Sequence, residues 1–226
     1  ATHATAFAVT KVRGKSAVAS ADRPGFIVNR LLVLLMGRIV GAVEDGTPVE
    51  VADRACDVLG LPMPPFQLFD LVGPAVGLHV LTSLREELGD AFPHSPGLER
   101  IVAERTELVG PPAAPGRPRR VLPEVQAVFD AAREESGSGA AGRAEPLDQA
   151  GVLDDVLTAL TREIRLMLDE GVVETASQID TAMILGAGWP FHLGGITPYL
   201  DRTGYSERVT GMRFLPRGVA DVPPAG

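Results

Sequence analysis

The chain has 226 residues, 45% of them hydrophobic, which is sufficient for one large or two small packed domains. Its formal net charge of -8 argues against nucleic acid or an anionic membrane as the main partner, because either would favour a concentrated basic face. A single cysteine, Cys56, excludes an intrachain disulfide, and no paired Cys/His spacing indicates zinc or another metal site. No signal peptide and no apolar run of roughly 20 residues is seen, so we expect a cytoplasmic protein without a membrane span.

Residues 1–22 start with a short helical pattern, THATAFAVTKV, and continue with small and β-branched residues at positions 16–20 that predict one buried strand. A single helix and a single strand have no sheet to join within this chain. No GxGxxG sequence follows a predicted strand, so the fingerprint of a dinucleotide-binding site is absent from the chain.

Residues 23–46 contain a long apolar segment, RPGFIVNRLLVLLMGRIVGAVEDG, which follows a Pro-Gly turn signal. Its apolar residues recur at intervals of three and four, which predicts a helix buried on most of its surface. Arg30 and Arg38 are about two turns apart and therefore share one face. Asn29 is polar in this apolar setting, and an unsatisfied amide there costs roughly 1 to 3 kcal/mol. Either Asn29 bonds a neighbouring backbone group, or its amide points into a substrate pocket.

Residues 49–59 form a second predicted helix, which Gly60 ends. The stretch that follows, LPMPPF, contains three prolines that forbid a regular helix, yet its apolar side chains must be sheltered from water. Such a stiff apolar loop is either the wall of a pocket or a structural elbow between helices.

Residues 107–150 are dominated by proline, glycine, alanine and serine. We interpret residues 111–150 as a linker that contains one helical island at residues 121–135.

Residues 151–226 repeat the plan of the first half. GVLDDVLTALTREIRLMLDEG matches FIVNRLLVLLMGRIVGAVEDG when Gly171 is superposed on Gly46, and a glycine- and proline-bearing elbow follows each copy. The two central helices are therefore expected to pack together as a pseudo-symmetric pair. In this superposition the Asn-Arg pair at 29–30 falls opposite the Asp-Asp pair at 154–155, so only the first copy retains the amide and the adjacent cation.

Three stretches of this sequence resemble a known family. PGFIVNRLL at residues 24–32 and LGLPMPPFQLFDLVG at residues 59–73 resemble the start of the C-terminal region of the NAD-dependent L-3-hydroxyacyl-CoA dehydrogenases of fatty-acid β-oxidation. IDTAMILGAGWPFHLGGITPYLDRTG at residues 179–204 resembles the second copy of that domain in the large multifunctional β-oxidation proteins.

The resemblance implies an all-α fold of two pseudo-repeated helical domains, at residues 23–110 and at residues 151–226, of which the second is degenerate. It implies that residues 1–22 are a helix-strand remnant of a Rossmann domain. In single-copy relatives this helical domain dimerises, so the second copy is expected to replace the partner subunit.

The resemblance also assigns site residues. The family places the asparagine of GFIVNR in the active site, and Asn29 matches it as a neutral donor to the substrate oxygen or to the catalytic base. Arg30 is assigned to substrate binding, with pairing either to the CoA or to an acidic group. The matching elbow lines the acyl and pantetheine side of the site, which makes Pro62, Met63 and Phe66 candidate substrate contacts.

The activity that the resemblance implies is oxidation of the L-3-hydroxyl group of an acyl-CoA, with transfer of a hydride to NAD. In the family the NAD site, the histidine base and the glutamate that holds it come from the Rossmann domain. This chain is therefore expected to be inactive alone. The implied partners are an acyl-CoA substrate, an upstream Rossmann domain, an enoyl-CoA hydratase domain and a thiolase subunit.

Two other interpretations remain open. The chain could be a non-catalytic helical module that binds a partner protein through its elbow loops, or a relative of the 3-hydroxyisobutyrate or 6-phosphogluconate dehydrogenases. The latter families lack the PGFIVNR stretch, which makes them the weaker alternative.

Overall fold

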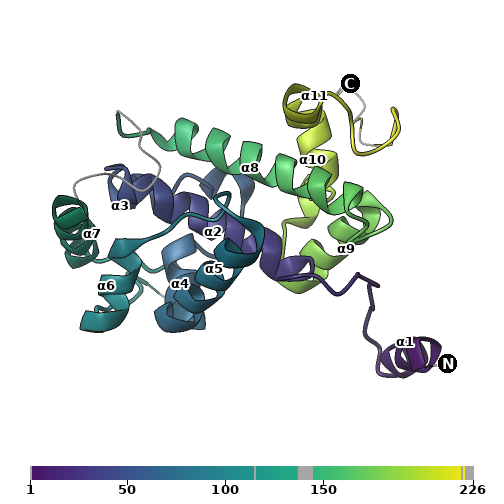
Figure 1. Ribbon diagram of the computed structural model, residues 1–226, viewed down its shortest axis with the longest axis horizontal. Helices are drawn as coiled ribbons and strands as arrows, with labels where there is room; N and C mark the ends of the chain where they lie inside the picture. The colour runs from purple at the N-terminus through teal and green to yellow at the C-terminus, as the bar shows by residue number, and fades with distance from the viewer. Residues whose placement is uncertain (1, 115, 137–144, 220, 222–226) are drawn as a thin grey trace.

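The computed structural model describes residues 2–114, 116–136, 145–219 and 221, and these residues are mainly helical (Figure 1). No β-strand occurs within these ranges. Val109 and Val121 form an isolated antiparallel bridge. The all-α class predicted from the sequence is therefore confirmed. The elements are α1 (Thr2–Val12), α2 (Val28–Glu44), α3 (Val49–Asp53), η1 (Asp57–Leu59), α4 (Pro65–Val72), α5 (Pro74–Leu88), α6 (Pro96–Glu104), α7 (Pro123–Ser136), α8 (Gln149–Asp169), α9 (Ala176–Ala187), η2 (Phe191–Leu193), α10 (Ile196–Arg202) and α11 (Tyr205–Thr210).

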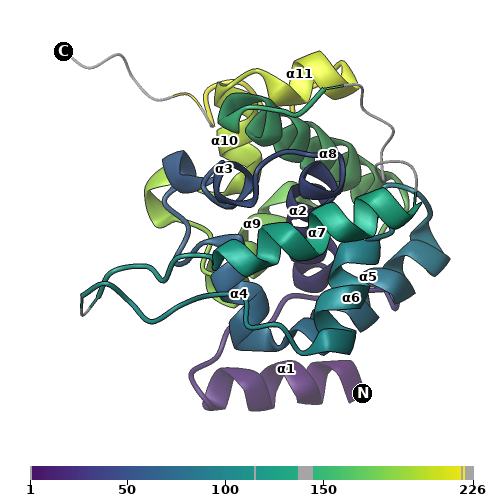
Figure 2. The same ribbon diagram turned by 90° about the vertical axis from the view of Figure 1, so that its left-hand side faces the viewer.

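Helix α2 lies at the centre of the molecule, with the other helices of the first copy on one side and α8 on the other (Figures 1 and 2). Its apolar residues at intervals of three and four are buried, which confirms the predicted buried helix. The helix starts at Val28, two residues later than the apolar run, because Gly25 and Phe26 have φ values of +72° and +49° that no right-handed helix contains.

Helix α8 packs against α2 and runs in the opposite direction. Arg30, near the start of α2, donates to Glu163 in the second half of α8, whereas Arg38 donates to Asp155 near the start of α8 through two hydrogen bonds of 2.8 and 2.7 Å. When Gly46 is superposed on Gly171, Arg30 falls on Asp155 and Arg38 falls on Glu163. The internal repeat therefore relates the Arg30–Glu163 pair to the Arg38–Asp155 pair. The central helices thus pack as the expected pseudo-symmetric pair.

The two elbow loops also meet each other. A Cβ atom added to Gly188 would lie 2.9 Å from Cγ of Pro62, and one added to Gly60 would lie 3.1 Å from Cε1 of His192. Both glycines have φ near +70°, so each position requires glycine for its backbone conformation as well as for space. The second copy therefore supports the elbow of the first.

A buried aspartate in each copy accepts a hydrogen bond from the first turn of the helix after the elbow. Asp53 accepts from the backbone N–H of Phe66 in α4, and Asp180 accepts from the backbone N–H of Thr197 in α10, each at 2.8 Å. An acceptor oxygen is favourable there because the first N–H groups of a helix lack backbone partners.

The first segment of the chain is only partly as predicted. Helix α1 is present, but the strand predicted at residues 16–20 is wrong: this segment pairs with no neighbouring strand within the described residues. A strand forms only when its backbone groups join a ladder. The backbone N–H of Ala21 instead donates to the carbonyl oxygen of Val172, at 2.8 Å. Helix α1 projects from the remainder of the molecule and is largely exposed (Figure 1).

The helical island predicted within the linker is α7, but it belongs to the core. Phe129 of α7 is fully buried, and its ring packs edge-on against Phe66, with the ring centroids 6.3 Å apart. Helix α7 lies along α6, where a Cβ atom added to Gly97 would come within 2.2 Å of the Phe129 ring. Residues 137–144 of the predicted linker lie outside the described part of the chain.

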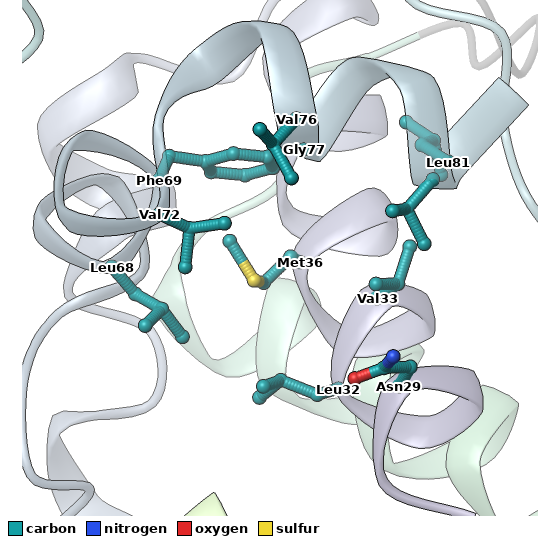
Figure 3. A pocket seen from close by; sticks show the side chains of 11 residues that line it. Asn29, Leu32, Val33, Met36, Leu68, Phe69, Val72, Val76, Gly77 and Leu81 are labelled. Atoms are coloured by element: carbon teal, nitrogen blue, oxygen red, sulfur yellow. The ribbon is translucent and has the colours of Figure 1, made fainter. Parts of the chain in front are cut away.

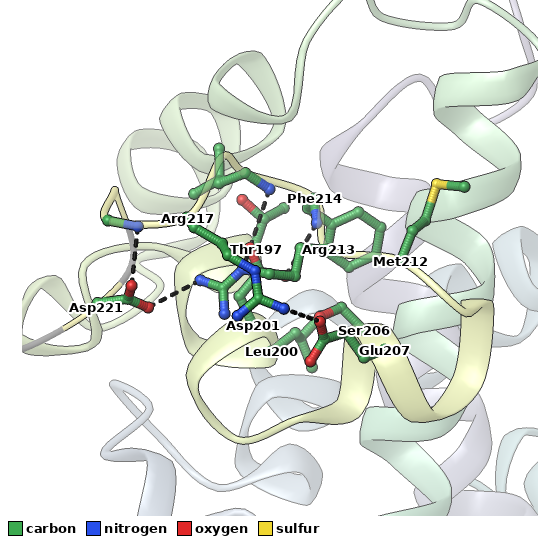
Figure 4. A network of polar contacts seen from close by, with 12 residues as sticks. Thr197, Leu200, Asp201, Ser206, Glu207, Met212, Arg213, Phe214, Arg217 and Asp221 are labelled. Carbon is green, nitrogen blue, oxygen red and sulfur yellow. Dashed lines mark hydrogen bonds and ion pairs between the residues drawn. The ribbon is translucent and has the colours of Figure 1, made fainter.

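The segment after α11 is tied to the second copy by its backbone (Figure 4). The buried carboxylate of Asp201 in α10 accepts hydrogen bonds from the backbone N–H groups of Phe214 and Leu215, at 2.9 and 3.0 Å. Arg213 pairs with Asp221 at 3.0 Å, which holds the next part of the segment. The described part of the C-terminal segment therefore follows the surface of the second copy.

Within the described residues, no single helix is both long enough and apolar enough to cross a bilayer. Helices α4 and α5 satisfy that test only when they are taken together, and they are bent by 102° at the break between them.

Candidate functional site

Asn29 lies at one end of an apolar cavity between α2, α4 and α5 (Figure 3). The cavity has a volume of about 160 Å³. Apart from Asn29 its lining consists of aliphatic side chains, Met36, Phe69 and Gly77. Asn29 is therefore the polar group that a ligand in this cavity would meet.

Asn29, the only asparagine in the sequence, is an exposed residue. Among the described residues, none forms a hydrogen bond with its side-chain amide. Of the two alternatives given for Asn29, the bond to a neighbouring backbone group is therefore not seen. An amide at the edge of an apolar cavity without a protein partner is available to a ligand.

The turn before α2 explains why the PGFIVNR stretch has its sequence. The backbone N–H of Arg30 donates to the carbonyl oxygen of Gly25 at 3.1 Å, and a Cβ atom on Gly25 would lie only 2.9 Å from that nitrogen. Phe26 has φ +49°, a conformation that bulky side chains rarely adopt and that is common near functional sites. This tight turn fixes where α2 starts and thus where Asn29 lies.

The elbow of the first copy forms the wall of a second cavity, of about 180 Å³. Pro62 and Met63 line it, together with Asp53, Cys56 and other residues of the loop. Burial raises the pKa of the Cys56 thiol to about 12, so this thiol stays protonated and behaves as a small core residue. The loop is thus both an elbow and a pocket wall.

Arg30 and Phe66 are fully buried in this conformation. The guanidinium of Arg30 pairs with Glu163 and, at 3.2 Å, with Glu170, so of the two partners expected for it the structure shows the acidic one. Phe66 packs between Phe69 and Phe129, with ring centroids at 6.2 and 6.3 Å. Both side chains support the fold. Direct contact with a ligand stays a prediction for these two residues, as it does for Asn29, Pro62 and Met63.

Sequence reasoning missed Glu163 and the apolar lining from α5. Glu163 is 133 residues from Arg30 in the sequence. The one sequence signal that singles it out is the superposition of the two copies, in which Glu163 is the counterpart of Arg38. The apolar positions of α5 were visible as a helical pattern, but nothing in that pattern distinguishes a cavity lining from core. Within the described residues, no group of three or more Asp, Glu, His or Cys side chains is placed to hold a metal ion.

We expect the Asp53→Asn substitution to change how stability depends on pH. Burial raises the pKa of Asp53 from 3.8 to about 6, and the hydrogen bond from the Phe66 N–H only partly opposes this. The folded chain then binds the proton more tightly than the unfolded chain, so this carboxyl makes the free energy of unfolding fall as pH rises from about 4 to 6. Asparagine keeps the acceptor oxygen and cannot ionise. The variant should match the parent near pH 4 and exceed it at pH 7 by an amount on the order of 2 kcal/mol.

Urea unfolding of both proteins at pH 4, 5, 6 and 7 measures this difference. Other buried carboxyl groups titrate in both proteins and cancel in the comparison. Parallel stability curves for parent and variant would show that Asp53 does not titrate in this range.

The fold and the cavity together define a duplicated helical domain with an apolar cavity in its first copy. Residues 25–108 match the family model described as 3-hydroxyacyl-CoA dehydrogenase, C-terminal domain. The resemblance recognised in the sequence is thereby confirmed: residues 25–108 form a C-terminal domain of the 3-hydroxyacyl-CoA dehydrogenase family.

Comparison with curated proteins extends the similarity over most of the chain. Over 211 residues this chain is 31% identical to the fatty acid oxidation complex subunit alpha of Acinetobacter baumannii strain SDF. Its identity to the same subunit of strain AYE is also 31% over 211 residues. These matches cover 91% of this chain and 29% of each relative, so the chain spans less than a third of their length.

A crystal structure of 3-hydroxybutyryl-CoA dehydrogenase from Escherichia coli supports the fold. It has a TM-score of 0.63 and 17% identity to this chain, and the match covers 96% of this chain and 63% of that one. At this level of identity the likeness supports the architecture of both copies and says nothing about the ligand.

Proposed function

We propose that this chain forms the substrate side of an NAD-dependent L-3-hydroxyacyl-CoA dehydrogenase of fatty-acid β-oxidation. The observation that carries the proposal is the free amide of Asn29 at the end of an apolar cavity, within a matched 3-hydroxyacyl-CoA dehydrogenase C-terminal domain. In this proposal the amide N–H of Asn29 donates to the oxygen on C3 of the substrate or positions the catalytic base. A fixed neutral donor stabilises the negative charge that develops on that oxygen as its proton leaves.

The elbow serves the remainder of the substrate in this proposal. Pro62 and Met63 line the second cavity and are assigned to the pantetheine side of the acyl-CoA. The second copy supports this arrangement from behind, because Glu163 pairs with Arg30, the residue after Asn29.

We assign NAD and the catalytic base to a separate Rossmann domain. A dinucleotide site of that kind needs a strand followed by a glycine-rich turn and a helix, and the described residues contain no strand, so they do not fit NAD. The exposed apolar side chains of α1, such as Val9 and Val12, would suit packing against that domain. It follows that this chain alone is inactive.

The curated relatives are named as subunits of a fatty acid oxidation complex, which supports assembly with further components. We propose an enoyl-CoA hydratase domain and a thiolase subunit as those components, in the cytoplasm.

The test uses Asn29 as its own reporter. Because the chain has one asparagine, protein labelled with ¹⁵N-asparagine gives the NMR signals of one side-chain amide group. Titration with acetoacetyl-CoA should shift these signals. In calorimetry Asn29→Ala should weaken binding by about two- to tenfold, the value of one neutral hydrogen bond.

The control is Gln149→Ala, which removes an exposed amide at the start of α8 and should leave binding unchanged. If the Asn29 signals do not move and the three proteins bind alike, the assignment of Asn29 to the substrate is wrong. Such a result would favour the alternative of a non-catalytic helical module.

A further inference from the structure

The apolar cavity beside Asn29 is lined by buried side chains, here called its floor, and by exposed side chains, here called its rim. Met36, Phe69 and Leu81 form the floor and are each at most 5% exposed. Val72 and Val76 form the rim and are about half exposed, at 47% and 53%. A ligand can therefore enter past the two valines but cannot pass beyond the floor.

The floor is rigidly packed. A Cβ atom added to Gly77 would lie 2.8 Å from the Phe69 ring, and one added to Gly37 would lie 2.9 Å from Cδ1 of Leu81. Side chains in such close contact with helix backbone cannot retreat without moving a helix. The depth of the cavity is therefore set by the fold.

The volume limits what the cavity holds. At about 160 Å³ it is close in size to an engineered apolar cavity of about 150 Å³ that binds benzene, a molecule of six carbons. Along α2, Met36 lies seven residues after Asn29, which corresponds to roughly 10 Å at 1.5 Å per residue. A chain of about six carbons that starts at Asn29 would fill this space.

We propose that this cavity receives the alkyl tail of the substrate beyond C3, and that it selects 3-hydroxyacyl- and 3-oxoacyl-CoA thioesters of short and medium chain length. With the oxygen on C3 at Asn29, tails of up to about six carbons beyond C3 fit inside, and further carbons remain in water. The inference rests on the proposed function, because it places C3 at Asn29.

The experiment is a titration series with 3-oxoacyl-CoA thioesters of increasing length, in protein with ¹³C-labelled methionine methyl groups. The chain has five methionines. Met36 lies in this cavity and Met63 in the elbow cavity, while Met167 and Met183 are buried in the second copy and serve as internal references.

We expect acetoacetyl-CoA, with one carbon beyond C3, to shift the Asn29 amide and to leave Met36 almost unmoved. The Met36 signal should then move progressively with longer tails. Affinity should rise about fourfold per added carbon, from the value of one buried methylene, and level off between 3-oxooctanoyl- and 3-oxodecanoyl-CoA, whose tails have five and seven carbons.

Two variants of the cavity should change, in opposite directions, the tail length at which the affinity levels off; this length is called the limit below. Val76→Phe narrows the rim and should end the gain at shorter tails, whereas Met36→Ala opens the floor and should extend it to longer ones. Val219→Phe makes the same change as the first variant at an exposed position outside the cavity and should leave the limit in place.

Three outcomes overturn the proposal. In the first, no thioester shifts the Met36 signal. In the second, the affinity rises steadily up to tails of twelve carbons; in the third, the tail length at which the affinity levels off is the same in Val76→Phe, Met36→Ala and the parent protein. Failure of the proposed function is read separately, from the Asn29 amide with acetoacetyl-CoA, whose tail is too short to reach the floor.

Discussion

Replacing Arg30 with methionine is expected to lower the free energy of unfolding by about 3 to 5 kcal/mol. The guanidinium is fully buried between α2 and α8 and pairs with Glu163, whose side chain is 6% exposed. Removing the cation leaves this carboxylate buried without its counterion, and the cost of desolvating that charge is no longer offset. Urea unfolding measures the change, provided that the slope m of the transition is the same in both proteins.

The internal repeat provides a matched control for this substitution. Arg38→Met breaks the pair that the repeat relates to the first, but Arg38 and Asp155 are 19% and 21% exposed and can be hydrated. That loss should cost about 1 kcal/mol. The double substitution Arg30→Met with Glu163→Met should recover most of the stability, because no buried charge is left unpaired: Glu170, which also loses Arg30, is 36% exposed and can be hydrated. Equal losses from Arg30→Met and Arg38→Met would contradict the role of burial.

Phe129→Ala is expected to cost about 3 to 5 kcal/mol, the usual loss for a large aromatic side chain in a packed core. Its ring is fully buried and packs against Phe66 of α4 and against Gly97 of α6, so truncation leaves a cavity between three helices. If α7 were merely a helical island in a linker, the same substitution would change stability by less than about 0.5 kcal/mol. Urea or thermal unfolding distinguishes the two cases.

Two further variants test the packing around Phe129. Glu134→Ala, at an exposed position of the same helix, should have almost no effect. Gly97→Ala alone should destabilise the fold, since its Cβ would lie 2.2 Å from the ring, but in the Phe129→Ala background the same methyl group enters empty space. The losses of the two substitutions should therefore sum to more than the loss of the double variant.

The elements that depend on local periodicity could be predicted from the sequence. The apolar spacing of residues 26–43 predicted α2, and the repeat with glycines 46 and 171 in register predicted that α2 and α8 pack together. The strand predicted at residues 16–20 failed because strand formation requires a partner, which β-branched composition cannot supply.

The environments of single side chains were harder to predict. Phe66 follows three prolines, and an apolar residue in such a loop reads alike whether it faces a pocket or the core. The composition around α7 resembles a linker, although Val125 and Phe129 are one turn apart and both are buried. The cavity beside Asn29 is formed by three helices, and its volume depends on close contacts at Gly37 and Gly77 that no local pattern contains.

The distribution of charge between α2 and α8 makes the two copies no longer interchangeable. All the cations of the two ion pairs lie on α2, and all the anions lie on α8. If two first copies met through this face as a symmetric dimer, Arg30 of each would face Arg38 of the other, and like charges would repel. Two chains could exchange their second copies without that repulsion. This division of charge disfavours a symmetric dimer of first copies through this face, so a chain that lost its second copy would leave this surface of α2 uncovered.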